Sequence, residues 1–515
     1  MSSKLSRKKF LKVSALGATG AAFTINPLMA ATNPAVQGSA RKTAASDMVN
    51  IALIGCGAQG PGVARSFMAL EDVRCVAGCD VYALKRDKFT QTVSDYYSER
   101  KVNNKGFKMY EHFEDLMLNK DVDAVVIATP DHWHALIGVA ACQAGKDIFV
   151  EKPMAFTVYE GQQLVKAVRK YGRVMQTGSM QRSMPTFEHM AKIARSGVMG
   201  KIKTIYAPVG DPPHEIDYEE QPVPAGLNWD KWLGPLSTKY YYNEELCPTG
   251  GGWGGWRWHK GLGGGYTTDW GAHMFDCAQW ALGKDGSGPV TIIPPEESPY
   301  NSLTYVYDNG VEMIQHYDPW DGNRGNSVKI IGENGWIFAS RGAYYCSDPA
   351  WSRTGQDDTV LPAARVDSYA GLTEEERAAA TQAVNALRAA QGTSGGAQGG
   401  PGGPGGPGGP GGPGGPGAPG GPGGFVAGVG RDGMEINQKH YRSFIDGIKT
   451  RTDPNTPVEV GQSSSVLCNI GNIAYDLKRT LHWNPITDQF IGDDEANNHS
   501  IMNYKMRAPY QIDVI

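Results

Sequence analysis

A glycine-rich turn near the start of the chain has the spacing of a phosphate-binding loop. The apolar run at 50–54 leads directly into G-x-G-x-x-G at 55–60, and a helix-like run follows. Such glycines allow a tight turn and let backbone N–H groups approach a pyrophosphate, whose negative charge the helix N-terminus favours. Asp80 closes the next apolar run, where a carboxylate would bind a ribose 2′-hydroxyl and repel a 2′-phosphate. The pattern predicts NAD as the cofactor, although Lys85 and Arg86 leave room for NADP.

Further polar side chains follow two later strand-like runs and occupy one helix-like segment. Residues 129–134 (Thr-Pro-Asp-His-Trp-His) come directly after one apolar run, and residues 151–153 (Glu-Lys-Pro) come after the next. In open α/β sheets this edge of the strands is where ligands bind. Much later, Asp269, His273 and Asp276 have the spacing of side chains on one face of a single helix.

The elements that must position these groups fall into two regions. From 48 to 179, short apolar runs alternate with helical stretches, which predicts a parallel sheet covered by helices. Between about 200 and 345, the hairpin signals Asp308-Asn309-Gly310 and Glu333-Asn334-Gly335 predict an open, largely antiparallel sheet. The expected fold class is α/β, with an N-terminal Rossmann dinucleotide-binding domain and a C-terminal α/β domain.

Four motifs in order make the chain resemble the Gfo/Idh/MocA oxidoreductases. These are GCGAQG, TPDHWH, EKP and GGGYTTDWGAHMFD. The resemblance covers about 48–345 and 433–485 and implies a second domain whose open sheet often forms homo-oligomers. The runs at 229–235 and 253–259 look like the secreted branch of the family, which acts on sugars.

The resemblance also implies roles for individual residues. Lys152 matches a lysine that contacts substrate and nicotinamide, His273 a general base or acid, and Asp269 an aspartate that orients the substrate. Each alone could be structural, but all three occur together with the dinucleotide turn. The expected cofactor-binding residues are Gly55, Gly57, Ala58, Gln59, Gly60, Asp80, Thr129, Pro130, His134, Glu151 and Lys152. The expected substrate-binding residues are Gln181, Arg182, Arg257, Asp269 and His273.

Composition excludes several other classes of protein. The chain has 515 residues with 49 basic and 53 acidic side chains, and this balance argues against a nucleic-acid partner. Its eight cysteines form no CxxC pair or zinc-like cluster, so no metal site is expected. No segment beyond the N-terminus approaches the length of apolar sequence that spans a membrane.

The N-terminus has the layout of an export signal, which predicts a periplasmic protein. Residues 1–31 combine a basic start, an apolar run and a small-residue end. The basic stretch resembles a twin-arginine (Tat) signal with Lys8 in place of the second arginine, so ordinary secretion stays open. Free NAD is not expected in that compartment, and the cofactor should therefore be tightly bound and returned to its starting state in each cycle.

The remaining segments complete the expected organisation. A flexible lead-in spans 32–47, the Rossmann domain 48–179, and the substrate and oligomerisation domain 180–345 with 430–485. A capping box at Thr373 predicts a helix to about Gln391. The Pro-Gly-Gly repeats place a disordered insertion at 392–424, since a collagen triple helix would need more repeats and three chains. Residues 486–515 are assigned only as a C-terminal tail.

The expected function is NAD(P)-dependent oxidation of a hydroxyl on a sugar or glycoside, and a 3-keto sugar is one product considered. One alternative is a redox-neutral NAD-dependent glycoside hydrolase, which oxidises the sugar transiently, eliminates the glycosidic bond and returns the hydride. A second alternative is a non-catalytic sugar sensor, which would be expected to lack the lysine or the histidine. Both Lys152 and His273 are present.

Overall fold

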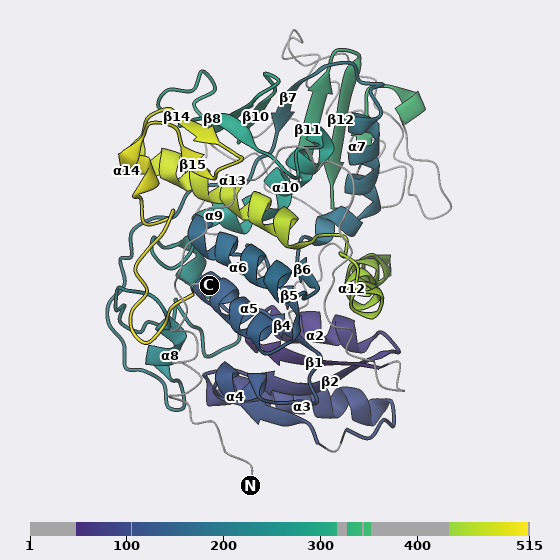
Figure 1. Ribbon diagram of the computed structural model, residues 1–515, viewed down its shortest axis with the longest axis vertical. Helices are drawn as coiled ribbons and strands as arrows, with labels where there is room; N and C mark the ends of the chain where they lie inside the picture. Colours follow the sequence, from purple (N-terminus) through teal and green to yellow (C-terminus); the bar gives the residue numbers. More distant parts are fainter. Residues whose placement is uncertain (1–47, 105, 317–326, 342–343, 352–431, 513–515) are drawn as a thin grey trace, which may run out of the picture.

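The computed structural model describes residues 48–104, 106–316, 327–341, 344–351 and 432–512. The predicted export signal, the lead-in, the helix expected at 373–391 and the Gly/Pro-rich insertion all lie outside these residues. Figure 1 shows two layered regions, with the smaller parallel sheet below and the larger sheet above. Within the described residues, no helix is long and apolar enough to cross a bilayer.

The first region is a six-stranded parallel sheet in the order β3-β2-β1-β4-β5-β6, covered by helices. Every residue of β4 and β5 is buried, as expected where helices cover both faces of a sheet. The strand order reverses between β1 and β4, which is the place where open α/β sheets bind ligands. The strands are β1 (Val49–Ile54), β2 (Val73–Cys79), β3 (Lys108–Tyr110), β4 (Ala124–Ile127), β5 (Asp147–Val150) and β6 (Met175–Thr177). The helices are α2 (Gly60–Met68), α3 (Ala83–Glu99), α4 (Phe113–Met117), α5 (His134–Gln143) and α6 (Val158–Lys170).

The second region is a nine-stranded mixed sheet in the order β13-β12-β11-β7-β10-β9-β8-β14-β15. Only β7 and β10 pair in parallel, and the other pairs are antiparallel. Its strands are β7 (Ile202–Tyr206), β8 (Pro289–Ile293), β9 (Thr304–Tyr307), β10 (Glu312–Ile314), β11 (Ser327–Gly332), β12 (Gly335–Ser340), β13 (Tyr344–Cys346), β14 (Leu481–Asn484) and β15 (Gln489–Phe490). The predicted fold class is therefore confirmed.

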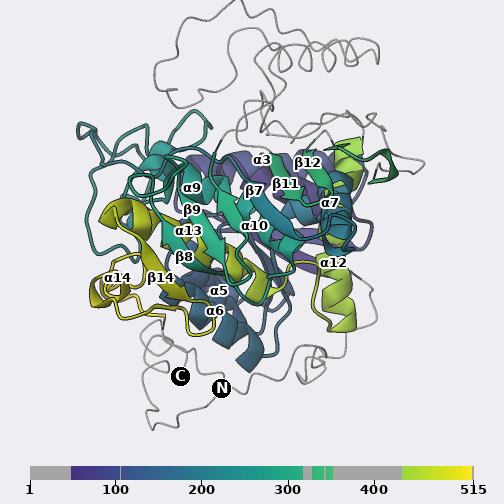
Figure 2. The same cartoon turned by 90° about the horizontal axis from the view of Figure 1, so that it is seen from above.

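Both predicted hairpins are present in this sheet. The Asp308–Gly310 turn joins β9 to β10, and the turn at Glu333–Asn334 joins β11 to β12, with Gly332 opposite Gly335. Three helices pack their apolar faces under the sheet and form the largest core with it, as Figure 2 shows from above. These are α7 (Pro185–Arg195), α10 (Gly271–Leu282) and α13 (Val458–Leu477).

A helix from late in the chain, α12 (Asp432–Thr450), completes the core of the first region. Tyr441 and Phe444 pack against Phe67 of α2 and Phe149 of β5, with ring centroids 4.6–5.9 Å apart. Outside this aromatic contact, Arg442 forms an ion pair with Asp72 at 2.6 Å. Residues that are 292 to 377 positions apart in the sequence thus share one apolar core.

The C-terminal residues are more than the tail assigned from the sequence. After α14 (Asp494–Asn497), the chain runs back over the start of α6, where the N–H groups of Val158 and Tyr159 donate to backbone carbonyls. The hydroxyl of Tyr504 donates to Glu160 at 3.2 Å, and the Tyr510 ring meets Trp133 edge-on at 5.3 Å. This C-terminal strap, residues 499–512, therefore joins the two regions from outside.

Candidate active site

The glycine-rich loop between β1 and α2 has the backbone that its sequence predicts. Gly55 adopts φ +93°, and a Cβ on it would lie 2.5 Å from the Ala128 carbonyl oxygen. A Cβ on Gly60 would lie 2.0 Å from the Gly55 oxygen, so this close approach also requires glycine. In front of Gly57, by contrast, the nearest atom to such a Cβ is 4.0 Å away. Backbone atoms thus pack tightly against Gly55 and Gly60, whereas the space in front of Gly57 is free for a phosphate group.

Asp80 lies at the end of β2 and braces this loop. One carboxylate oxygen accepts the Cys56 N–H at 2.7 Å and the other accepts the Tyr82 N–H at 2.9 Å. Burial raises the pKa of Asp80, and Lys85 counteracts that rise. Arg86 donates to the Asp80 carbonyl oxygen and pairs with a glutamate, so its charge is already engaged. Each carboxylate oxygen can accept one more hydrogen bond, such as one from a ribose hydroxyl.

The loops after β4 and β5 form the rest of this edge. Ala58 and Gln59 lead into α2, and the Gln59 amide donates to Glu151 at 3.2 Å. Burial raises the pKa of Glu151. Pro130 precedes a 3₁₀ turn, and the hydroxyl of Thr129 is buried without a hydrogen-bond partner among the described residues. An orphaned buried hydroxyl beside an open phosphate cradle fits a bound dinucleotide.

His134 does not have the role assigned to it from the sequence. Its two ring nitrogens contact the carbonyl oxygens of Pro153 at 2.7 Å and Thr129 at 2.9 Å. Burial lowers the pKa of His134 to about 4. The neutral ring has a single N–H, so it donates to one of these two carbonyl oxygens, and both of its nitrogens face protein backbone and not a cofactor.

Lys152 and Asp269 form a partly buried ion pair at the centre of the site. Lys152 Nζ donates to a carboxylate oxygen of Asp269 and to its backbone carbonyl, both at 2.7 Å. Arg257, expected to contact substrate, lies 3.7 Å from the same carboxylate and stacks between Trp253 and Trp256. Burial alone would raise the pKa of Asp269, but the two cations hold it below its ordinary value. Asp269 is therefore ionised, and its carboxylate holds the side chains of Lys152 and Arg257 in place.

The single helix predicted across Asp269, His273 and Asp276 is wrong. The chain forms α9 (Gly265–Asp269) and then α10, with a break at Trp270. The Asp269 carbonyl would accept the His273 N–H in a continuous helix, but it accepts Lys152 instead. The His273 N–H donates to Trp270 at 3.0 Å. The hydrogen bond from Lys152, a residue of the first region, thus interrupts the helix between Asp269 and His273.

His273 is buried next to Gln181. In the amide orientation that satisfies its neighbours, Gln181 places its nitrogen 2.8 Å and its oxygen 3.2 Å from His273 Nδ1, and its oxygen accepts from Arg341. Gln181 can therefore serve either tautomer of the imidazole. Burial lowers the pKa of His273 well below its usual range, and the charges of Lys152 and Arg341 add to this effect. The imidazole is neutral and sits beside the reacting site; Gln181 orients it.

Arg182 does not have the role in substrate binding expected from the sequence. Its guanidinium group is 4% exposed and pairs with Asp276 and Asp285, both at 2.7 Å. This bidentate buried network fixes the chain after β6 to α10. No donor of this side chain is directed to a sugar.

The sequence analysis missed Asp131 as a candidate functional residue. It is 7% exposed, and burial raises its pKa to about 8; the negative charge of Asp269 adds to that rise, and Lys152 and Arg257 oppose it. A protonated carboxyl beside a lysine–aspartate pair can donate a proton at neutral pH. Its position in the TPDHWH run was the available signal, but nothing in that run shows how deeply it is buried.

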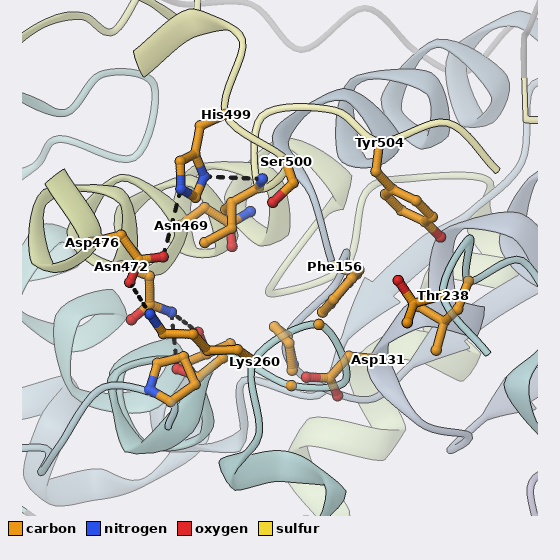
Figure 3. Close-up of a pocket in the computed structure, with 18 of the residues that line it drawn as sticks. Asp131, Phe156, Thr238, Lys260, Asn469, Asn472, Asp476, His499, Ser500 and Tyr504 are labelled. Carbon is orange, nitrogen blue, oxygen red and sulfur yellow. Dashed lines mark hydrogen bonds and ion pairs between the residues drawn. The ribbon is translucent and has the colours of Figure 1, made fainter. Parts of the chain in front are cut away.

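Asp131 also borders a cavity of about 280 Å³ between the two regions. Figure 3 shows Asp131 and Phe156 on one side of the open space, with Asp476, His499 and Asn469 on the other. Pro153 and Thr268 line it as well, and they are the immediate neighbours of Lys152 and Asp269 in sequence. The cavity therefore adjoins the candidate catalytic groups.

Comparison with known proteins decides the family. Residues 49–179 match the oxidoreductase family with an NAD-binding Rossmann fold, and residues 213–390 and 434–512 match its C-terminal alpha/beta domain. The chain belongs to the Gfo/Idh/MocA family.

Individual members of the family match over shorter stretches. A glycosyl hydrolase family 109 protein from Shewanella pealeana is 31% identical over 175 residues, or 32% of this chain and 38% of that protein. Inositol 2-dehydrogenase from Salmonella typhimurium is 34% identical over 130 residues, or 25% of this chain and 36% of that enzyme. The chain thus spans less than half of the length of these curated relatives.

A solved structure shares the fold. The NAD binding oxidoreductase from Klebsiella pneumoniae has a TM-score of 0.51 at 18% identity, covering 84% of this chain and 99% of the other. This similarity extends across both regions of the molecule.

Proposed function

We propose that this family member oxidises a hydroxyl group of a sugar or glycoside with a tightly bound nicotinamide cofactor, NAD in preference to NADP. The observation that carries this proposal is the partly buried ion pair of Lys152 and Asp269 beside a neutral His273, at the sheet edge where the glycine-rich loop also ends. Asp80 favours NAD because its carboxylate would repel a 2′-phosphate.

The side chains divide the work at the reacting hydroxyl. The glycine-rich loop and Asp80 would hold a nicotinamide dinucleotide, which would supply the acceptor for the hydride of the alcohol carbon. Lys152 stabilises the negative charge that develops on oxygen as the hydroxyl loses its proton. His273 accepts that proton, since its imidazole is neutral, and Gln181 holds the ring in place. Asp269 keeps Lys152 Nζ at a fixed position.

The first experiment asks which cofactor the protein carries and whether a sugar reduces it. The purified protein is denatured and the released small molecule is identified by its mass, which distinguishes NAD from NADP. Native protein, with added NAD if none is released, then receives a panel of sugars and methyl glycosides, and reduced-nicotinamide absorbance is followed. Reduction by at least one of them is expected. Absence of both cofactor reduction and glycoside cleavage would favour the sugar-sensor alternative.

A redox-neutral glycoside hydrolase is the second candidate function. Two observations favour it: a protonated Asp131 could donate to a leaving-group oxygen, and the family 109 glycosyl hydrolase is a relative. The two functions differ in stoichiometry. A dehydrogenase accumulates one oxidised sugar for each reduced cofactor, whereas the hydrolase releases free sugar and aglycone with no net change in the cofactor.

Asp131 makes this second function dependent on pH. The carboxyl donates only when protonated, so the rate of glycoside cleavage should fall as the pH rises through about 8, the raised pKa of Asp131. Asp131→Asn should lower that rate by about 100-fold and remove this limb of the profile. The measurement is kcat/KM for a nitrophenyl glycoside from pH 5 to 10, with Asp121→Asn, on the surface, as the control. An unchanged limb in Asp131→Asn would refute the assignment.

Two further parts of the proposal rest on the sequence and on family resemblance. We propose export to the periplasm, from the layout of residues 1–31, and a homo-oligomer formed through the second-region sheet. Export requires a cofactor that is loaded in the cytoplasm and retained, which agrees with a reaction cycle that restores it.

A further inference from the structure

We infer that the cavity beside Asp131 is a binding subsite for a second sugar ring, so that the substrate is a disaccharide or a larger glycoside. This inference rests on the proposed function. Lys152, Asp269 and His273 are not among the residues that line the cavity, although its wall includes the sequence neighbours of the first two. A ring in the cavity would therefore lie next to the reacting hydroxyl and would not carry it.

The polar groups of the cavity require a ligand that both donates and accepts hydrogen bonds. Asn469 and Asn472 lie one turn apart on α13 and are 4% and 2% exposed. The Asn472 amide nitrogen donates to Gly264 and Thr268, so its orientation is fixed and its oxygen is left without a partner among the described residues. The Asn469 amide nitrogen also has no partner there. A buried donor and a buried acceptor on one wall match a sugar hydroxyl, which can satisfy both.

The charges of the cavity favour a neutral ligand. Lys260 Nζ contacts Asp476 at 2.6 Å, and His499 Nε2 lies 3.5 Å from the same carboxylate. The second ring nitrogen of His499 accepts the Ile501 N–H at 3.3 Å, which leaves the proton on the nitrogen facing Asp476. Burial alone would raise the pKa of Asp476, but hydrogen bonds from His499 and Lys260 lower it. The lysine and the aspartate therefore compensate each other, and neither is free to bind an ion.

Apolar surfaces and size complete the match to one pyranose ring. Phe156 and Tyr504 meet edge-on with centroids 5.9 Å apart, and Figure 3 shows both beside the open space, opposite the polar cluster. Such faces pack against the C–H groups of a sugar. The volume of about 280 Å³ is at the lower limit of ordinary ligand pockets, which suits one ring.

The test compares disaccharides with the methyl glycosides of their reacting rings. The probes are cellobiose, lactose, maltose and chitobiose, each paired with the methyl glycoside of either constituent sugar. Binding is measured by calorimetry and turnover by kcat/KM. At least one disaccharide should bind the parent protein ten-fold or more tightly than its methyl glycosides.

Two variants test whether this cavity is responsible for the preference. Asn469→Leu removes an amide nitrogen that has no partner among the described residues, so the variant should fold. Ser500→Trp fills the space from an exposed position on the strap. Both should reduce the preference for the disaccharide at least ten-fold. Asn498→Trp, exposed on the same segment and outside the cavity lining, is the matched control and should keep the preference.

The outcomes separate the subsite from the chemistry. Equal binding of one-ring and two-ring probes, or a preference that both variants retain, overturns the subsite while the proposed oxidation stands. Binding of a disaccharide with the expected sensitivity to the variants, but without reduction or cleavage, supports the subsite and overturns the chemistry. If no probe binds, both are overturned.

Discussion

Replacing Lys152 with methionine should lower the rate of sugar-dependent cofactor reduction by about 100- to 1,000-fold, the usual cost of losing one preorganised group that stabilises developing charge. Methionine keeps the length and apolar stem of lysine but cannot donate a proton or carry charge. The variant also releases Asp269, whose carboxylate keeps Arg257 at 3.7 Å as its remaining cation. The substitution should therefore lower kcat strongly and the melting temperature only slightly.

Single-turnover absorbance of the bound cofactor measures this effect directly. Lys166→Met, at an exposed position on α6 of the same region, is the matched control and should react at the parent rate. Mass analysis of the released cofactor shows whether Lys152→Met still carries it. A variant that is fully loaded and reduced at the parent rate would show that Lys152 has only a structural role.

Replacing His273 with alanine should slow the same step by about 100- to 10,000-fold, because a positioned general base is removed. His273 lies on α10 of the second region, whereas the glycine-rich loop lies on the first, so the bound cofactor should remain. In the parent, burial and the neighbouring cations Lys152 and Arg341 lower the pKa of His273, so the imidazole is neutral before the reaction and has a lone pair for the proton.

Gln181→Ala separates base chemistry from packing. It should reduce kcat less than His273→Ala does, because the ring keeps its nitrogens but loses the amide that orients Nδ1. His482→Ala, on the exposed side of β14, is the control for losing an imidazole. If His273→Ala reduces its cofactor as fast as the parent, His273 is not the general base.

The sequence predicts those parts of the site that depend on neighbours along the chain. The glycine-rich loop, Asp80 at the end of β2 and the two hairpins follow from local backbone preferences and strand patterns, and the structure has all of them. The motifs also identified the family, because they combine several local patterns in a fixed order.

The errors concern contacts between distant residues. The helix expected across Asp269 and His273 breaks because Lys152, over one hundred positions earlier, takes the Asp269 carbonyl. From the sequence, Arg182 is expected to contact the substrate, but the fold pairs its guanidinium group with Asp276 and Asp285. No local sequence pattern encodes such distant partners. The raised pKa of Asp131 likewise depends on burial by residues that are distant in the sequence.

The position of α12 determines when the cofactor region can finish folding. Phe67 and Phe149 are fully buried, yet they are partly covered by Tyr441 and Phe444, which are synthesised 292 to 377 residues later. A nascent chain that has not reached residue 432 leaves this aromatic surface open to water, and closing so long a loop is slow. The dinucleotide-binding region is therefore first in the chain but among the last to become stable, and a nascent chain gains its full affinity for a cofactor only after nearly all of it has been made.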